Sequence, residues 1–184
     1  GLFFGRLCMD MDLKKLLQER KATIVKRWFD AVAETYPDDT SRFLKKQKAQ
    51  FANPVGYTIS EGIERLFEAL QQGMLPDTVS TFLDSIIRIR AVQNFAPSEA
   101  VAFIFHLKKV IRQELGDEIL KQQGVTEQLS AFDSTIDDLA LYAFDIYMKC
   151  REKIYEIKAN EAKNATFRLL QRAKLMESGG EEQK

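Results

Sequence analysis

The chain has 184 residues, of which 45% are hydrophobic and 29% charged, and its 27 lysine and arginine residues balance 27 aspartate and glutamate residues. This composition is typical of one folded domain with an appendage and excludes a disordered chain, since a domain of this size buries enough apolar surface to fold without disulfides or metal. The zero net charge provides no overall attraction for nucleic acid or acidic lipid, so neither is an expected partner.

The two cysteines, Cys8 and Cys150, lie far apart and outside any Cys-x-x-Cys motif. They predict neither a disulfide framework nor a zinc site, and they fit a reducing cytoplasm. No apolar run approaches the roughly 20 residues that a membrane-spanning helix needs, which argues against membrane insertion. Residues 1–11, before the first predicted helix, are expected to be a disordered extension.

Prolines mark the helix boundaries in the first half of the chain. They stand at positions 37, 54, 76 and 97, where apolar patterns of helical period start or stop, as expected of a residue that cannot continue a helix. Before the first proline, the pattern predicts one long helix from about 13 to 36, with Asp12 as its N-cap and a kink near Arg20. A short amphipathic segment follows and ends before Phe51.

Asn53 is the predicted N-cap of the next helix, which has Pro54 at its first position and ends at Gly73. Two further helices are predicted, from Pro76 to about residue 92 and from Pro97 to a C-cap at position 116. All of these segments have helical periodicity, so the predicted fold class is all-α.

The last predicted helix is unusually long. No proline follows position 97 and no glycine lies between positions 124 and 179, so a helix can run from about Thr126 to Lys174. At 1.5 Å per residue it would be roughly 70 Å long, more than a compact domain of this size spans, and it is expected to project. The predicted organisation is a helical domain at 12–150, a projecting linker helix at 151–177 and a disordered tail at 178–184.

An apolar stripe with heptad spacing lies on the first part of that long helix. Such a stripe suits a core or a dimer seam, and because it continues into a polar tail we expect it to pass from packing within the domain into an intersubunit seam. Its members are Leu129, Phe132, Ile136, Leu139, Ala143 and Ile146.

His106 is the only histidine of the chain. It is either an axial ligand to haem or another metal, or a core histidine with one hydrogen bond, and the second interpretation is favoured because no second ligand stands nearby in the sequence. Asp133, Asp137 and Asp138 cluster on the last helix without a Glu-x-x-His motif, so a solvated face is favoured over a metal site. No nucleophile elbow, dinucleotide loop or P-loop motif occurs, so we expect neither an enzyme nor a cofactor.

Arg88 and Arg90 stand among isoleucines, and Gln93 follows them. Residues two apart on a helix point in different directions, so at least one guanidinium must approach the apolar side, where an unpaired charge is expensive. A buried ion pair is favoured over an anion or partner site. Asn53, near two helical glycines at 56 and 62, presents a similar choice, and close helix packing is favoured over a ligand site.

Several blocks of the sequence together resemble the N-terminal domain of the RsbT co-antagonist family, the sensor proteins of bacterial stressosomes. The resemblance runs from about residue 13 to residue 115, and the blocks are Arg27-Trp28, Tyr36-Pro37, Arg42-Phe43-Leu44-Lys45-Lys46-Gln47, Phe51-Ala52-Asn53-Pro54-Val55-Gly56, Ile86-Ile87-Arg88-Ile89-Arg90-Ala91-Val92-Gln93 and Ala96-Pro97-Ser98.

This resemblance implies an all-helical, globin-like sensor domain that lacks haem, forms a homodimer and extends its last helix as a signalling linker. In better-known relatives the linker enters a C-terminal domain that is phosphorylated and builds the stressosome core. No such domain is present in these 184 residues, so we expect a regulator that acts without it. The resemblance brings no catalytic residue.

The leading hypothesis is therefore a non-enzymatic sensory or regulatory protein of the cytoplasm, dimeric, that binds an unidentified regulatory protein. One alternative is a sensor that binds haem or a hydrophobic small molecule in a pocket near His106. Another is an assembly factor or subunit of a larger complex.

Overall fold

The structure is a computed structural model that describes residues 12–46, 51–73, 77–121 and 123–181. The contacts divide the chain into two units, Gly1–Tyr147 and Met148–Lys184. The expected N-terminal extension, residues 1–11, lies outside the described residues, as do residues 182–184 of the expected tail.

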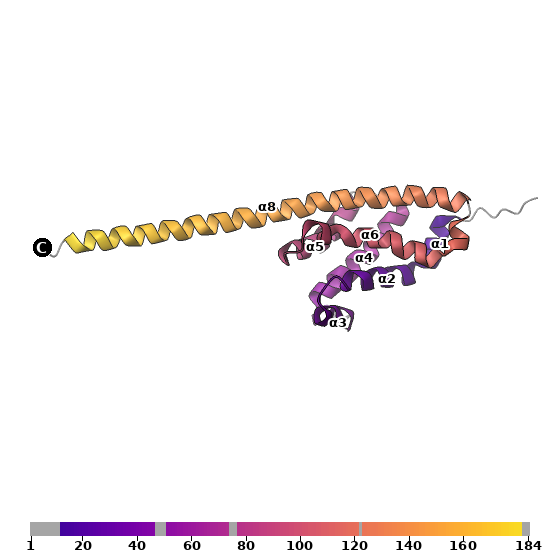
Figure 1. The fold of residues 1–184 in the computed structure, drawn as a ribbon, viewed down its shortest axis with the longest axis horizontal. Coiled ribbons are helices and arrows are strands. Elements are labelled where there is room, and N and C mark those ends of the chain that lie inside the picture. The colour runs from indigo at the N-terminus through magenta and orange to yellow at the C-terminus, as the bar shows by residue number, and fades with distance from the viewer. Residues whose placement is uncertain (1–11, 47–50, 74–76, 122, 182–184) are drawn as a thin grey trace, which may run out of the picture. The chain divides into compact units, whose positions relative to one another are not determined.

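The described residues form eight helices, and the all-α prediction is confirmed (Figure 1). In chain order they are α1 (Leu13–Glu19), α2 (Lys21–Ala33), α3 (Asp38–Lys46), α4 (Pro54–Gln72), α5 (Asp77–Val92), α6 (Pro97–Leu115), α7 (Asp117–Leu120) and α8 (Gln123–Glu181).

The first predicted helix is divided into α1 and α2 at Arg20, where a kink was expected. Asp12 caps α1, since its side chain accepts a hydrogen bond from the backbone N–H of Lys14 at 3.0 Å. The prediction for α4 is confirmed at both ends: Asn53 and Pro54 begin it, and Gly73 ends it with a φ of 66°. Glycine adopts this left-handed conformation without steric cost.

The core of the first unit is built around α2, α4 and α6. Trp28 of α2 is fully buried, and its indole Nε1–H donates to the carbonyl oxygen of Phe103 on α6 at 2.7 Å. Gly62 of α4 lets α5 approach closely, because a Cβ at that position would stand 2.8 Å from Cδ1 of Ile86. Close packing, the interpretation favoured from the sequence, therefore explains this helical glycine.

The part of α8 in the first unit runs antiparallel to α6, as two ion pairs show. Lys108 Nζ lies 2.6 Å from Asp137 Oδ1, and one turn farther along α6 Arg112 pairs with Asp133. The two helices lie side by side in Figure 1. The solvated face expected for these carboxylates is thus wrong for Asp133, which its ion pair largely covers, whereas Asp137 is paired but exposed.

The second unit contains the remainder of α8. Side chains from residue 155 to residue 173 are exposed, and the large apolar ones among them are Tyr155, Ile157, Phe167, Leu169 and Leu170. The helix begins at Gln123 and continues to Glu181, which is past the predicted end near Lys174 and into the segment predicted as a tail. The linker role of this unit stays a prediction. None of the described helices is long and apolar enough to cross a membrane.

Candidate functional site: a charged groove and a buried arginine

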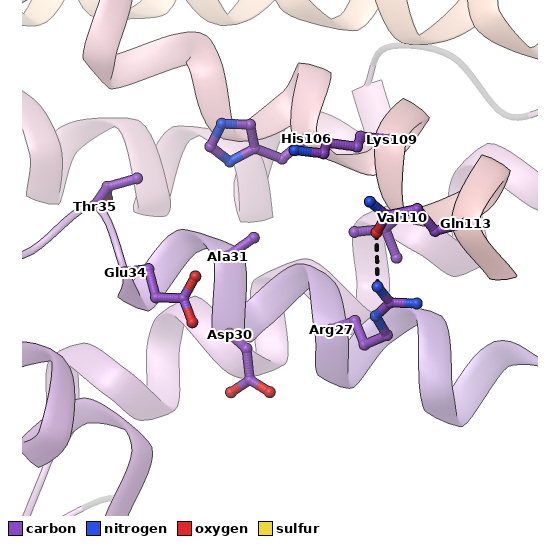
Figure 2. Close-up of a pocket in the computed structure, with 9 residues that line it drawn as sticks. All are labelled: Arg27, Asp30, Ala31, Glu34, Thr35, His106, Lys109, Val110 and Gln113. Atoms are coloured by element: carbon purple, nitrogen blue, oxygen red, sulfur yellow. Dashed lines mark hydrogen bonds between the residues drawn. The ribbon is translucent and has the colours of Figure 1, made fainter.

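A groove of about 490 Å³ lies between α2 and α6 (Figure 2). Its lining side chains recur every three or four residues along each helix, so each set occupies one helical face. The residues are Arg27, Asp30 and Ala31 on α2, Glu34 and Thr35 directly after its end, and His106, Lys109, Val110 and Gln113 on α6.

Contacts at one end of the groove and beneath it hold the two helices at a set spacing. Arg27 Nη2 donates to Gln113 Oε1 at 2.6 Å (Figure 2), and the same guanidinium pairs with Glu114. In the core between the same two helices, Trp28 stacks on Phe103, with 6.2 Å between ring centroids. The groove is therefore bounded by packed helices rather than by loops.

Charged side chains line both sides of the groove. Arg27 and Asp30 stand on α2 and Glu34 directly after it, whereas Lys109 and His106 stand on α6. Among the described residues no ion pair within 4 Å crosses between these groups, and Glu34 instead pairs with Lys45 of α3 at 3.0 Å.

His106 lines the groove and is half-buried. Burial lowers the pKa of its imidazole, and the nearby cations Arg90 and Lys109 lower it further, so the neutral ring is favoured. The Nδ1 atom is buried and lacks a hydrogen-bond partner within the described part of the chain. No group of three His, Cys, Asp or Glu side chains that could hold a metal was found among the described residues. The absence of a cofactor stays a prediction.

Arg90 is completely buried and contacts Thr35, one of the residues that line the groove. Its Nη2 donates to Thr35 Oγ1 at 3.0 Å and to the carbonyl oxygen of Glu99 at 3.1 Å. The guanidinium carbon stands 4.2 Å from the ring centroid of Phe95 and 5.5 Å from that of Tyr36, distances typical of cation–π contacts. Its Nε and Nη1 have no hydrogen-bond partner in the described residues, and burial lowers its pKa.

The buried ion pair expected for Arg88 or Arg90 is therefore wrong for both. Arg90 has no carboxylate within 4 Å among the described residues, and aromatic rings take the place of a counterion. Arg88 is exposed and pairs with Asp84 one turn earlier on α5. Periodicity places one arginine on the apolar side, but only the fold shows what surrounds it.

A series of direct side-chain contacts through Arg90 connects the groove to α8. Thr35 both lines the groove and accepts from Arg90, and Arg90 stacks on Phe95. The carbonyl oxygen of Phe95 accepts a hydrogen bond from the hydroxyl of Tyr147 at 2.6 Å. Tyr147 is the last residue of the first unit. We call Thr35, Tyr36, Arg90, Phe95 and Tyr147 the Arg90 cluster.

The structure places the other predicted polar residues apart from the groove. Gln93 is exposed, and its Oε1 accepts from the hydroxyl of Tyr36 at 3.1 Å, which puts it at the edge of the Arg90 cluster. Asn53 is fully buried at the start of α4, where its Oδ1 accepts from the N–H of Gly56 at 2.8 Å and its Nδ2 donates to the carbonyl oxygen of Leu44 at 3.2 Å. Asn53 therefore caps α4 and joins it to α3.

The side chains of the predicted dimer seam are already covered by their own chain. Phe132 is half-buried and the others are buried, with exposed fractions of 7% or less: Leu129, Ile136, Leu139, Ala143 and Ile146. The intersubunit role of this stripe stays a prediction, and little of its surface is left for a second copy. Exposed apolar side chains of the same helix, Leu141 and Phe144, stand beside it.

Sequence reasoning missed most of the groove. Asp30, Glu34 and Lys109 look like ordinary charges on the outer faces of two helices, and no motif distinguishes them. Their spacing at three or four residues shows which residues share a helical face, but not that the two faces meet. His106 was the one groove residue identified in advance.

Residues 22–162 match the family described as RsbT co-antagonist protein rsbRD N-terminal domain. The chain belongs to this family. The matched part contains the whole groove and the Arg90 cluster, and it extends past Tyr147 into the second unit.

A relative in Archaeoglobus fulgidus, described as an uncharacterized protein, is 28% identical over 145 residues, which cover 75% of this chain and 82% of the relative. No solved structure gives a significant match. The globin-like character that the family resemblance implies therefore stays a prediction, whereas membership of the RsbT co-antagonist N-terminal domain family and the all-α fold are shown.

Proposed function

We propose that this chain is a non-enzymatic sensory domain of stress signalling that acts through contacts with an unidentified regulatory protein in the cytoplasm. The observation that carries the proposal is the extent of the family match, from residue 22 in α2 to residue 162 in α8. The family domain thus includes both the packed helices and the start of the exposed helical segment. An exposed helix has a free surface on which a partner can bind.

The Arg90 cluster is a physical route by which the first unit could influence that segment. It joins the ends of α2 and α5 to the start of α6, and Tyr147 attaches α8 to the same place. A rearrangement at Thr35 or Arg90 would change the support of Phe95, and with it the hydrogen bond to Tyr147. Coupling of this kind is carried by such contiguous contacts.

The homodimer implied by the resemblance is part of this proposal. The ion pairs of Lys108 with Asp137 and of Arg112 with Asp133 join α6 to α8, and both helices carry exposed apolar side chains. Phe105, Leu141 and Phe144 are 44%, 69% and 42% exposed. We call them the apolar patch and propose it, in place of the covered stripe, as the contact with a second copy.

The alternative of haem or a hydrophobic ligand beside His106 receives less support, because the groove there is lined by charged side chains. Ligand pockets for apolar molecules are mostly apolar. The other alternative is an assembly factor or subunit of a larger complex. It predicts that the chain is bound to its partners in a constant stoichiometry, whereas a sensor would bind its partner only in response to a signal.

Affinity purification of the tagged chain from its own source, followed by mass spectrometry, tests the proposal. A matched variant with Phe167→Glu and Leu170→Glu changes only exposed side chains of the second unit. We expect a signalling protein to be captured by the original chain and lost from the variant. Capture of metabolic subunits in a constant ratio would favour the assembly-factor alternative and contradict the sensory role.

A further inference from the structure

We propose that uptake of a proton by His106 loosens the packing of α2 against α6, so that the groove is an acid-sensitive element of the first unit. The stimulus would be a fall in pH rather than a ligand. The loosening itself is a property of the first unit, and only its use as a signal rests on the proposed sensory function.

His106 stands in the middle of the face of α6 that packs on α2. Toward the start of α6, Phe103 stacks on Trp28, and its carbonyl oxygen accepts from the indole N–H at 2.7 Å. Toward the end of α6, Gln113 accepts from Arg27 at 2.6 Å (Figure 2). Residues three or seven apart share a helical face, so the imidazole lies between the contacts that hold the two helices together.

The buried nitrogen of the imidazole favours the neutral ring. Nδ1 of His106 is buried and has no hydrogen-bond partner in the described residues. The neutral ring can carry its proton on Nε2 and leave only a lone pair at Nδ1, whereas the protonated ring carries an N–H on both nitrogens. A second proton would therefore place a charged donor at a buried position without an acceptor, which costs free energy.

The cations near the ring add to this cost. Arg90 of α5 and Lys109 of α6 both lower the pKa of His106, after the larger effect of burial. Lys109 forms no ion pair within 4 Å in the part of the chain that the structure describes. A protonated imidazole would stand beside two like charges, and like charges disfavour the charged form.

The carboxylates of the neighbouring elements do not balance the charge. That of Asp30 on α2 is directed away from α6 (Figure 2). The others act on cations of their own: Glu34 on Lys45, Glu99 on Arg90, Glu114 on Arg27, Asp133 on Arg112 and Asp137 on Lys108. Separation of α6 from α2 would relieve the cost, because water could then hydrate the protonated ring.

Trp28 records such a separation. It is the only tryptophan of the chain, it is buried, and it is bonded to α6 through Phe103. Water that reaches the indole shifts its emission to longer wavelength. The same loosening would reach the Arg90 cluster, because Thr35 lines the groove and accepts from Arg90.

Fluorescence of the full chain, recorded from about pH 7.5 to about pH 5.0, tests the inference. We expect the emission of Trp28 to shift in one step with a midpoint below about pH 6.5, the value of a free imidazole. The helical circular dichroism signal should stay unchanged through the step. His106→Gln should abolish the step, since the amide has a similar size and does not titrate in this range.

A second variant and a matched control test the electrostatic part. Lys109→Met removes one of the two cations near the ring and should move the midpoint to higher pH, because protonation becomes less costly. Lys26→Met removes an exposed cation of α2 outside the groove and should leave the midpoint unchanged. A histidine that only fills space would respond to neither variant.

Four results would overturn the inference. They are an emission that does not change with pH, a step that persists in His106→Gln, a midpoint that Lys109→Met leaves in place, and a simultaneous loss of helical signal, which would be ordinary acid unfolding. Affinity capture at about pH 7.5 decides on the regulatory partner separately, because it does not depend on the Trp28 step. Capture that changes at about pH 5.5 in the original chain, but not in His106→Gln, would support the use of the step as a signal.

Discussion

At position 90 a guanidinium is buried among aromatic rings, with two of its nitrogens unpartnered in the described residues. A buried charge without a counterion costs free energy, and replacing such groups by apolar ones of similar size is often neutral or stabilising. The Thr35 hydroxyl and the Glu99 carbonyl would lose a donor, which opposes part of that gain. The burial of Arg90 is therefore not explained by a contribution to stability alone.

The first prediction follows from this balance. Arg90→Met should change the free energy of unfolding by no more than about 1 kcal/mol, because the methionine fills most of the volume and removes the buried charge. Arg90→Ala should cost about 2–4 kcal/mol, because it leaves a cavity beneath the rings. Urea unfolding followed by circular dichroism measures both. Equal losses for the two variants would show that the hydrogen bonds of the guanidinium, and not its volume, support the fold.

The second prediction concerns His106, whose pKa is lowered chiefly by burial and then by Arg90 and Lys109. In the unfolded chain the imidazole titrates near about pH 6.5, so as the pH falls through that value the unfolded state binds a proton before the folded state does. Stability should therefore decrease as the pH falls from about 7.5 to about 5.5. Thermal unfolding across this range should show a smaller decrease for His106→Gln, and an identical decrease would assign it to other groups.

At the scale of the elements, the start of α4 illustrates how one side chain organises a helix. Asn53 accepts from Gly56 and donates to Leu44, and a Cβ at position 56 would stand only 2.1 Å from the Asn53 side chain. The glycine is needed because the capping side chain occupies the space. The same contacts attach the end of α3 to α4.

The third prediction separates the hydrogen bond that Asn53 accepts from Gly56 from the one that it donates to Leu44. Asn53→Asp keeps an oxygen that can accept from Gly56 but loses the donor to Leu44, whereas Asn53→Ala loses both. We expect Asn53→Ala to destabilise the fold by about 2–3 kcal/mol and Asn53→Asp by less, since a cap is worth about 1 kcal/mol and an unsatisfied buried carbonyl costs more. Chemical denaturation measures both, and a variant pair of equal stability would show that the hydrogen bond from Gly56 contributes nothing.

The fourth prediction distinguishes the covered stripe of α8 from the apolar patch beside it. Leu139 is 2% exposed and Leu141 is 69% exposed. Leu139→Asp should destabilise the first unit by about 3 kcal/mol or more, because the charge enters the core. Leu141→Asp should leave the fold intact and convert a dimer into a monomer.

Light scattering and thermal unfolding of the two variants provide the measurement. A chain that is monomeric at micromolar concentration before any substitution would contradict the dimer. If Leu141→Asp stays dimeric and folded, the second copy binds elsewhere.

At the scale of the whole molecule, the contacts that bury the core fall within the unit that ends at Tyr147. The side chains from residue 155 to residue 173 are exposed, so they add little burial to the fold. An isolated helix in water is marginal, because its nucleation is costly and no tertiary packing supports it. Binding of a partner would therefore stabilise the helix of the second unit more than any other part of the molecule.

The fifth prediction tests this division. A chain ending at Arg151, one turn beyond Tyr147, should keep its unfolding free energy within about 1 kcal/mol of the full chain, since it retains the core. A peptide of residues 148–184 should be only partly helical by circular dichroism. A large loss of stability on truncation would show that the second unit supports the first.

The sequence alone predicted most of the helices and several of their ends, because these depend on local chemistry, but it missed α7 and placed the end of α8 too early. Prolines cannot continue a helix, Asn53 caps one, and Gly73 ends one with a left-handed conformation. It also predicted the family, through blocks such as those around Trp28 and Arg90. The apolar stripe from Leu129 to Ile146 was identified as a contact surface for the same reason, since periodicity shows which residues share a face.

Only the tertiary structure decided which faces meet. The stripe of α8 packs within its own chain, Asp133 and Asp137 pair with α6, and Arg90 lies among aromatic rings rather than beside a carboxylate. The groove of Asp30, Glu34, His106 and Lys109 exists only because α2 and α6 lie beside each other. Helical periodicity is set by bonds between residues three or four positions apart. These contacts join residues separated by about 20 to 80 positions, and the helical propensity of each segment does not reveal which segments meet.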